Sequence, residues 1–587
     1  MNLSYKKNNN SQLFSSLAKQ ELMDAHLTQN YIPIYSRFFS LTDTNFNNIN
    51  LNNKYALNDV NQKIDNNTFN CTLIDNSGNK SEKSVFFKFS PLLDPIKYMV
   101  GKYDISDNNL LKLPSYNSDH SHSKVVDPNN SAYVDGFFTY LTSQLLHTHN
   151  FVHSLDFYGS FLSIKNNFVV NVVDDLDYIN NSEFFHKNKD VLFHLDNGFY
   201  SELMNYDTRN YKERLSFKEE LSENILQLTD ISDLSKLDNL FSNKKIVENT
   251  EINSNTEINS NTEINSTAQL LFEYDNSANK HYSHSTTSNC SSRSSNTCSS
   301  MEIDGDSENI ESDNETNSEY STATDDTILA TITKFPIQII ALEHCEKTLD
   351  HLLTSVESGN YKMSDKELGS IILQILMILI TYRKTFGLTH NDLHTNNIMY
   401  ISTEKKYLYY RVNDKHYKVP TFGRIFKIID FGRAIYKYKG NIMCSDSFGL
   451  NGDASTQYNC EPYFNKNKPR IEPNFSFDLC RLGCSMFDYY VDDIADIKKI
   501  TSPIKKIIIE WCNDDKLRNV MYKNNGEERY PDFKLYKMIA RTVHNHIPID
   551  VLRKPYFETF VVNKKKINNI GQIMNIDNLP SYMDSNC

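Results

Sequence analysis

Short apolar runs separated by polar residues fill the chain from Tyr31 to about Val172. Runs of this length, rich in Phe, Ile, Val and Tyr and broken by Asn, Asp and Ser, are typical of strands. The interval from Ser131 to Leu146 differs, because its apolar residues recur at the spacing of a helix. These residues are Val134, Phe137, Phe138, Leu141, Leu145 and Leu146. We therefore predict strands with one helix in this part of the chain.

The second half of the chain is mainly helical in pattern. After a short strand at Pro336 to Leu342, Ser364 and Glu367 form a capping box that opens a helix running to about Lys384. The middle of this helix, Ile371 to Ile380, is apolar all round, which is typical of a buried helix. Three further helices are predicted at Phe477 to Tyr490, Pro503 to Trp511 and Phe533 to Val543. A strand-rich part thus precedes a helix-rich part, which favours two lobes with a cleft between them.

The regular pattern is lost between about Lys244 and Asp326. The six-residue repeat N-T-E-I-N-S occurs three times from Asn249, and a Ser-rich stretch and an acidic tract follow it. This composition cannot bury enough apolar area to offset the entropy lost on ordering. We predict a disordered insertion here, within a larger insertion at 181–328. Residues 1–30, which are polar and Asn-rich, are predicted to be a poorly ordered tail, and 561–587 a C-terminal tail.

Charge and cysteine content limit the possible partners and the cellular compartment of the protein. The 587 residues include 61 Lys plus Arg and 74 Asp plus Glu, so the net charge is −13. Ten of the acids lie between Met301 and Asp326, so the acidity is local and gives no argument for a nucleic-acid partner. The 10 cysteines form no C-x-x-C pair, which indicates a reducing compartment. No apolar stretch reaches the length of a bilayer, so we expect a soluble, intracellular protein without membrane insertion.

Three polar side chains stand beside apolar runs at places suited to chemistry. Asp392 and Asn397 lie five residues apart in a loop that follows the buried helix, and Asp430 ends an apolar strand shortly before Gly432. Phosphoryl transfer requires a group that orients or deprotonates the attacking hydroxyl, oxygen ligands for Mg²⁺, and cations on the phosphates. The three side chains suit the first two requirements.

His390-x-Asp392-x-x-x-x-Asn397 resembles the catalytic loop of the protein kinase superfamily, and Asp430-Phe431-Gly432 resembles its D-F-G motif. The resemblance implies an α+β, bilobal fold with a strand-rich small lobe and a helix-rich large lobe. It also implies that Asp392 is the catalytic base, that Asn397 and Asp430 hold Mg²⁺, and that His390 supports the loop. ATP would be the phosphoryl donor and a protein hydroxyl the acceptor. These motifs, together with the Asn/Ile/Lys/Tyr bias and the six-residue repeat, look most like those of the serine/threonine kinases of large nucleocytoplasmic DNA viruses, a resemblance that implies the host cytoplasm or the virion as the location.

The segment Val85 to Phe89 resembles the kinase strand whose lysine binds the α- and β-phosphates, which would be Lys88. The usual partner of that lysine is a glutamate on the following helix. The 131–146 helix has Asp135 as its only acid, and we take Asp135 as a substitute. The alternative is that Asp135 is an exposed acid favoured by the helix dipole.

Two further segments resemble kinase elements. Ile339 to Cys345 resembles the strand and hinge whose backbone meets adenine, so Glu343 and Cys345 are candidate nucleotide-binding residues. Asp478 to Gly483 resembles the start of a central helix whose aspartate braces the catalytic loop. By this resemblance the small lobe spans 31–180 and 329–346, including the hinge, and the large lobe spans 347–560.

The chain also departs from the kinase pattern. The first glycine is Gly78, so only other residues could cover the phosphates in place of a Gly-rich loop before Lys88. Asn391 replaces the arginine that receives an activating phosphate, and Tyr407 to Val419 is predicted to be an inserted hairpin. His394 stands where protein kinases usually have a lysine.

His394 is shared with haspin-like, choline-kinase-like and aminoglycoside-phosphotransferase-like enzymes, and we infer that it also acts in catalysis. Two alternatives to a protein kinase therefore stay open. One is a small-molecule phosphotransferase of the same fold, which His394 favours. The other is a non-catalytic pseudokinase scaffold, suggested by the missing glycine loop and helix glutamate. A scaffold has no chemical need for Lys88, Asp392, Asn397 and Asp430 together.

Overall fold

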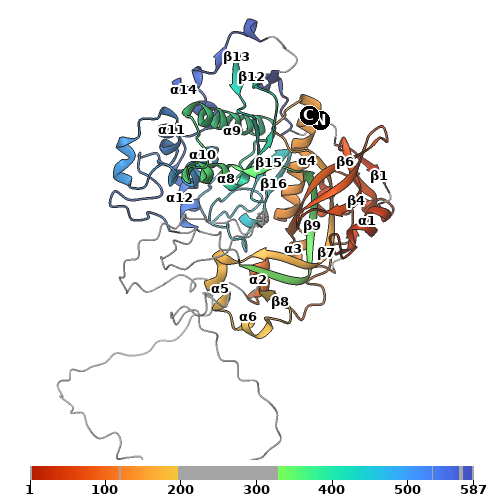
Figure 1. The fold of residues 1–587 in the computed structure, drawn as a ribbon. Coiled ribbons are helices and arrows are strands. Elements are labelled where there is room, and N and C mark those ends of the chain that lie inside the picture. Colours follow the sequence, from red (N-terminus) through yellow and green to blue (C-terminus); the bar gives the residue numbers. More distant parts are fainter. Residues whose placement is uncertain are drawn as a thin grey trace, which may run out of the picture. The chain divides into compact units, whose positions relative to one another are not determined.

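The computed structural model describes residues 3–8, 10–117, 120–195, 328–531, 533–567 and 573–584. Within them the fold is mixed α/β, with a curled antiparallel sheet built mostly from the first third of the chain and long helices from the second half (Figure 1). The predicted disordered stretch from about 244 to 326 lies outside the described residues. The arrangement as two kinase-like lobes stays a prediction.

One sheet of seven strands is the largest element. Its order is β2-β7-β9-β6-β5-β4, and β8 also pairs with β9. The strands are β2 (Ala25–Gln29), β4 (Tyr55–Lys63), β5 (Thr68–Asp75), β6 (Lys80–Pro91), β7 (Phe157–Asn171), β8 (Phe193–Leu195) and β9 (Leu329–Glu343). The predicted strands at 85–89 and 336–342 lie within β6 and β9. Residues 183–195, which we assigned to the insertion, form α6 (Glu183–Asn188) and β8, because Phe185 and Phe193 are fully buried.

Helix α4 (Ser131–His149) packs against this sheet and corresponds to the helix predicted at 131–146. Figure 1 shows it alongside β9 and β7. The side chain of Asn130 caps its first turn, and Asn150, whose φ of 55° is left-handed, caps its C-terminal end. Gly136 permits a close approach to β9, because a Cβ there would lie 2.5 Å from Nε2 of Gln338. The helix is buried from Ala132 to Leu145.

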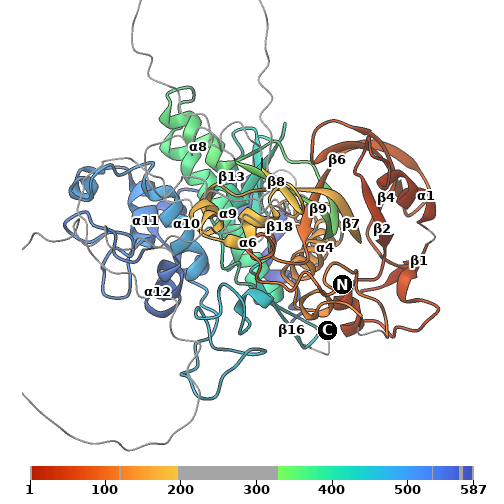
Figure 2. The ribbon, with the colours of Figure 1, turned by 90° about the horizontal axis from the view of Figure 1, so that it is seen from below.

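The prediction that residues 1–30 are poorly ordered is wrong for the described part of this segment. Helix α1 (Ser11–Leu17) contacts β2 and β4, as Figure 2 shows, and places Leu13 and Leu17 in the core. The Asn-rich composition suggested disorder because asparagine is polar. The side chain of Asn10, however, donates to the carboxamide oxygens of Asn30 and Asn50, both at 2.7 Å. These hydrogen bonds connect asparagines from three separate parts of the chain inside the protein.

The helices predicted in the second half are present. Helix α9 (Asp365–Phe386) is buried through its middle, and Oγ of Ser364 accepts the backbone N–H of Glu367, as the capping box predicts. The carboxylate of Glu367 instead accepts from the hydroxyl of Tyr361 at 2.7 Å and from Arg424 at 3.0 Å. The other predicted helices are α10 (Phe477–Phe487), α11 (Pro503–Trp511) and α12 (Lys534–Thr542).

Among the described residues, α9 alone is long and apolar enough to cross a membrane by length and composition. Of its most apolar window, 89% is buried inside the protein. A core helix of a folded domain passes the same test.

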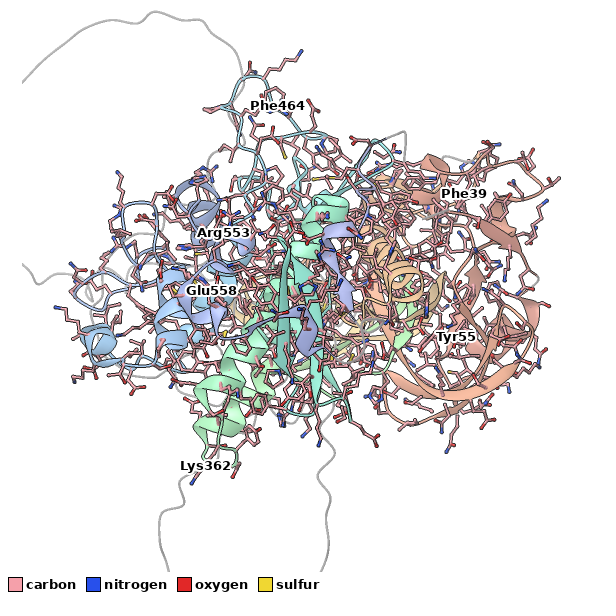
Figure 3. All side chains as sticks on the ribbon, turned by 90° about the horizontal axis from the view of Figure 1, so that it is seen from above. Phe39, Tyr55, Lys362, Phe464, Arg553 and Glu558 are labelled. Carbon is pink, nitrogen blue, oxygen red and sulfur yellow. The ribbon has the colours of Figure 1, made fainter. Side chains whose placement is uncertain are left out.

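The predicted hairpin consists of β12 (Tyr407–Val412) and β13 (Lys415–Pro420), joined at two residues with positive φ. Each strand of the hairpin pairs on its outer edge with a strand from later in the chain. β17 (Val561–Val562) joins β13, and β18 (Ile573–Asn575) joins β12. Glu558 of α14 (Pro555–Glu558), labelled in Figure 3, forms an ion pair with Lys415. Residues that we assigned to a C-terminal tail thus belong to this sheet, because unpaired strand edges attract further strands.

Candidate active site

Lys88 lies on β6, the third strand of the meander β4–β5–β6, and is almost fully buried. Its ammonium nitrogen contacts two carboxylates, Oδ2 of Asp135 at 2.7 Å and Oδ1 of Asp430 at 2.9 Å. Burial lowers the pKa of Lys88, but the two carboxylates outweigh burial, and the pKa is raised overall. Lys88 is therefore a charged lysine held between two acids.

Asp135 connects α4 to the Asp430-Phe431-Gly432 segment. Its Oδ2 binds Lys88, and its Oδ1 accepts the backbone N–H of Phe431 at 2.8 Å. The residue is 3% exposed, which excludes the alternative of a solvent-exposed acid at the helix start. Aspartate is one methylene shorter than glutamate, and it reaches Lys88 because Gly136 lets α4 lie close to β9.

Asp430 follows β14 (Arg424–Ile428) and has a left-handed backbone, with φ of 62°. Its Oδ1 also accepts the backbone N–H of Gly432 at 3.3 Å. The next residue, Phe431, is buried, and its ring centroid lies 4.5 Å from that of Phe138 on α4. The turn thus directs one side chain to Lys88 and packs the next against the helix that carries Asp135.

The loop with Asp392 lies between α9 and β11 (Ile398–Ser402), which pairs with β14. At the start of α10, the carboxylate of Asp478 accepts the backbone N–H groups of His390 at 3.0 Å and Asn391 at 2.9 Å. The ring of His390 accepts the N–H of Asp392 at Nδ1 and donates from Nε2 to Ile429 O. Both side chains therefore brace the loop.

Asp392 is 2% exposed, and its Oδ1 accepts the hydroxyl of Tyr536 at 2.8 Å. Arg481 donates from Nε to the same hydroxyl at 2.9 Å. Burial alone would raise the pKa of Asp392, but the charges of Arg433, of His394 once its ring is protonated at low pH, and of Arg481, together with the Tyr536 hydrogen bond, lower it to about 2. The carboxylate is thus ionised at neutral pH.

His394 and Asn397 contact each other beside Asp392. Nδ2 of Asn397 donates to the backbone oxygen of Asp392 at 2.9 Å and meets Nε2 of His394 at 3.1 Å. Nε2 therefore accepts, and the ring proton lies on Nδ1. Burial lowers the pKa of His394 to about 4, so the ring is neutral at pH 7.

Asn397 and Asp430 lie at neighbouring ends of the β11–β14 pair. Asn397 immediately precedes β11, Asp430 follows β14 by two residues, and Ile429 donates its N–H to Asn397 O at 3.0 Å. Because the amide nitrogen of Asn397 is already hydrogen-bonded, its carboxamide oxygen is the atom that would bind a metal. A carboxylate and a carboxamide oxygen are hard ligands of the kind that Mg²⁺ prefers.

Glu343, the last residue of β9, and Cys345, just after it, are the candidate nucleotide-binding residues, and both side chains face the protein. Oε2 of Glu343 accepts from Nζ of Lys427 at 2.6 Å, and its backbone N–H donates to Asp156 O at 2.9 Å. Cys345 is buried, and burial raises the pKa of its thiol to about 12. The carboxylate of Glu343 is thus engaged by Lys427, and the thiol of Cys345 lies in the protein interior.

Sequence reasoning missed three residues around Asp392: Arg433, Arg481 and Tyr536. Arg433 forms an ion pair with Asp453 and lies over the ring of Tyr536, 5.7 Å from the centroid. Arg433 directly follows Asp430-Phe431-Gly432, and Arg481 lies within the segment from Asp478 to Gly483, so both positions carried a local signal. Tyr536 comes from α12, 144 residues after Asp392, and no spacing rule connects the two.

No protein-family model matches the chain. An alignment over 218 residues, which covers 35% of the chain, is 26% identical to a protein of Acanthamoeba polyphaga mimivirus named "Putative serine/threonine-protein kinase". The match covers 51% of that protein, so the chain spans about half the length of this relative. The similarity supports a distant kinase-like relationship.

Proposed function

We propose that this chain is an ATP-dependent serine/threonine protein kinase with a small lobe around the seven-stranded sheet and a large lobe around α9. The observation that carries the proposal is the meeting of Lys88, Asp135 and Asp430, which come from three distant segments. Protein kinases use a lysine on their third strand, an acid on the following helix and the D-F-G aspartate in this way. The distant similarity to a mimivirus protein named as a kinase agrees with it.

The charges suit a nucleotide with its metal. Lys88 would bind phosphate oxygens while Asp135 keeps its ammonium group in place. Two carboxylates around one lysine leave an excess of negative charge, which favours a cation next to Asp430. Asp430 and Asn397 would hold Mg²⁺, which, when bound, neutralises charge on the β- and γ-phosphates.

Asp392 would orient the acceptor hydroxyl. A carboxylate with a pKa near 2 is a weak base, so we infer that it takes the proton late, as the bond to phosphorus forms. This timing fits a loose transition state, in which the attacking oxygen keeps its proton for most of the reaction. The neutral ring of His394 can donate one hydrogen bond to developing charge.

A small-molecule phosphotransferase is the second candidate, and His394 favours it. Protein kinases usually carry a lysine at this position, with a fixed charge that the neutral imidazole lacks. The two candidates share their phosphate chemistry and differ in the acceptor.

The test is transfer from labelled ATP with Mg²⁺ to a protein mixture and, separately, to a panel of small alcohols. We expect label on protein serine and threonine, and none with Asp392→Ala or Lys88→Met. Asp550→Asn, which changes an exposed acid, serves as the control. Label on small alcohols alone would support the phosphotransferase, and nucleotide binding without any transfer would support the scaffold.

A further inference from the structure

Asp446 joins the segment that follows Gly432 to the start of α4. It comes just after the hairpin of β15 (Ile435–Tyr438) and β16 (Asn441–Cys444). Its Oδ1 accepts the backbone N–H of Ser131, the first residue of α4, at 3.0 Å. Its Oδ2 forms an ion pair with Lys124 on α3 (Ser123–Val126). Both carboxylate oxygens therefore bind residues that precede or open α4.

Backbone contacts strengthen this connection. The N–H of Asp446 donates to Asn129 O at 2.8 Å. Arg37 donates to Oδ1 of the same Asn129 at 2.9 Å and to Ile442 O of β16 at 3.2 Å. The segment after Gly432 is thus attached to the residues before α4 by several polar contacts at once.

The position of the carboxylate is electrostatically favourable. The first N–H groups of a helix have no partner within the helix, and the helix dipole places partial positive charge there. Asn130 accepts the N–H of Ala132, and Asp446 accepts that of Ser131, so the two side chains divide the first turn between them. A charged acceptor forms a stronger hydrogen bond than a neutral one.

Asn391 has no means of receiving a phosphate as an arginine would. Its amide nitrogen donates to Thr389 O at 3.2 Å and to Arg433 O at 2.9 Å. Its oxygen accepts the hydroxyl of Tyr458 at 2.8 Å. The side chain is committed to its own loop and its neighbours.

We propose that Asp446 is a positioning residue that holds α4, and with it Asp135, in the arrangement needed for transfer without phosphorylation of residues 433–476. This inference rests on the proposed kinase function. A phosphate on such a segment acts by adding negative charge and acceptor oxygens that order the segment and position the helix. Asp446 supplies both permanently. Because Asp135 lies one turn after Ser131, a shift of the first turn moves the carboxylate that binds Lys88.

The activity test compares Asp446→Asn and Asp446→Ser with the parent chain at saturating ATP. We expect kcat to fall roughly 10- to 100-fold, the scale of one lost charge-assisted hydrogen bond, with little change in KM for the protein substrate. Asp446→phosphoserine, made by incorporation during translation, should recover most of the rate lost in Asp446→Ser. Phosphatase treatment of the parent chain should leave its rate unchanged, and Asp550→Asn is the matched control.

Hydrogen exchange gives a readout that does not depend on activity. Asp446→Asn should speed exchange of the backbone amides in the first two turns of α4, whereas Asp550→Asn should not. Should Asp446→Ser fail to fold, Lys124→Met, which removes one partner of Asp446, takes its place with a smaller expected loss.

The outcomes separate this inference from the proposed function. A parent chain without transfer activity would refute the kinase proposal, and faster exchange in Asp446→Asn would still support the connection to α4. Parental exchange and parental turnover in Asp446→Asn would overturn the inference. Loss of activity on phosphatase treatment, or no recovery with phosphoserine, would overturn it as well.

Discussion

The two charged clusters of the site are built in opposite ways. Around Lys88, one cation lies between two carboxylates. Around Asp392, one carboxylate lies near two guanidinium groups, Arg433 and Arg481, with the hydroxyl of Tyr536 between Asp392 and Arg481. The first cluster has surplus negative charge, which suits a cation. In the second, positive charge keeps a buried carboxylate ionised, which suits an acceptor of a hydroxyl proton.

The largest effect on activity is expected from removing the carboxylate of Asp430, one of the two that contact Lys88. Asp430→Ala should abolish phosphoryl transfer with the fold intact, because Lys88 keeps Asp135 as a partner while a metal ligand is lost. Turnover and the melting temperature should be measured together, with Asp430→Asn as the isosteric variant. Near-parental turnover of Asp430→Ala at ordinary Mg²⁺ would refute the assignment of the metal site.

His394 tests the second cluster through catalysis. His394→Ala should lower turnover by roughly 10- to 1000-fold with little change in ATP affinity, the scale of one transition-state donor. His394→Lys should retain activity towards protein hydroxyls. The alternative is that His394 only packs the loop, and full activity or loss of folding in His394→Ala would favour it.

The same histidine predicts a pH dependence of stability. Its pKa is lowered to about 4 in the folded chain, so between about pH 6.5 and 4 the unfolded chain binds a proton that the folded chain does not. Acidification over this window should therefore lower the free energy of unfolding, by about 1.4 kcal/mol per pH unit at most from this group. Chemical denaturation at several pH values should show that the free energy of unfolding changes less per pH unit in His394→Asn than in the parent. An unchanged pH dependence would contradict the lowered pKa of His394. His544→Asn, which alters a half-exposed ring, is the control.

Tyr536→Phe tests how much the hydroxyl in the cluster around Asp392 contributes to stability. It removes the hydroxyl between Arg481 and Asp392 and leaves both charges buried, so we expect the free energy of unfolding to fall by about 1–3 kcal/mol. Asp392 should stay ionised at pH 7, because the two arginines remain. Denaturation of Tyr522→Phe, which also removes one hydroxyl–carboxylate bond, provides the reference. Equal stability of Tyr536→Phe and the parent would show that the hydroxyl contributes nothing to the cluster.

The smallest effect is expected outside both clusters. Replacing residues 244–326 by a short flexible linker should leave the melting temperature and ATP turnover nearly unchanged, because their composition predicts no core. A substantial loss of either would show that this stretch contributes to the structure.

Local patterns predicted much of the fold and one part of the site. Helix α11 begins and ends where the sequence indicated, since Ser502 caps it and its apolar face is regular. Lys88 and Asp430 could be found because each stands beside an apolar strand in a short motif. Tyr536 and Asp446 could not, since each acts on a partner more than a hundred residues away. The prediction of a poorly ordered N-terminal segment was wrong because a single sequence does not reveal that Asn10 pairs with Asn30.

The two bonds of Asp135 have a consequence for conformational equilibria. One oxygen holds Lys88 and the other holds the N–H of Phe431, so α4 cannot withdraw without releasing both. Displacement of the helix and rotation of Phe431 are therefore coupled rather than independent. A ligand that binds preferentially when α4 is displaced therefore also favours the rotated Phe431, and the reverse holds too. The coupling free energy is about 1.5–3 kcal/mol if it arises from one charged hydrogen bond.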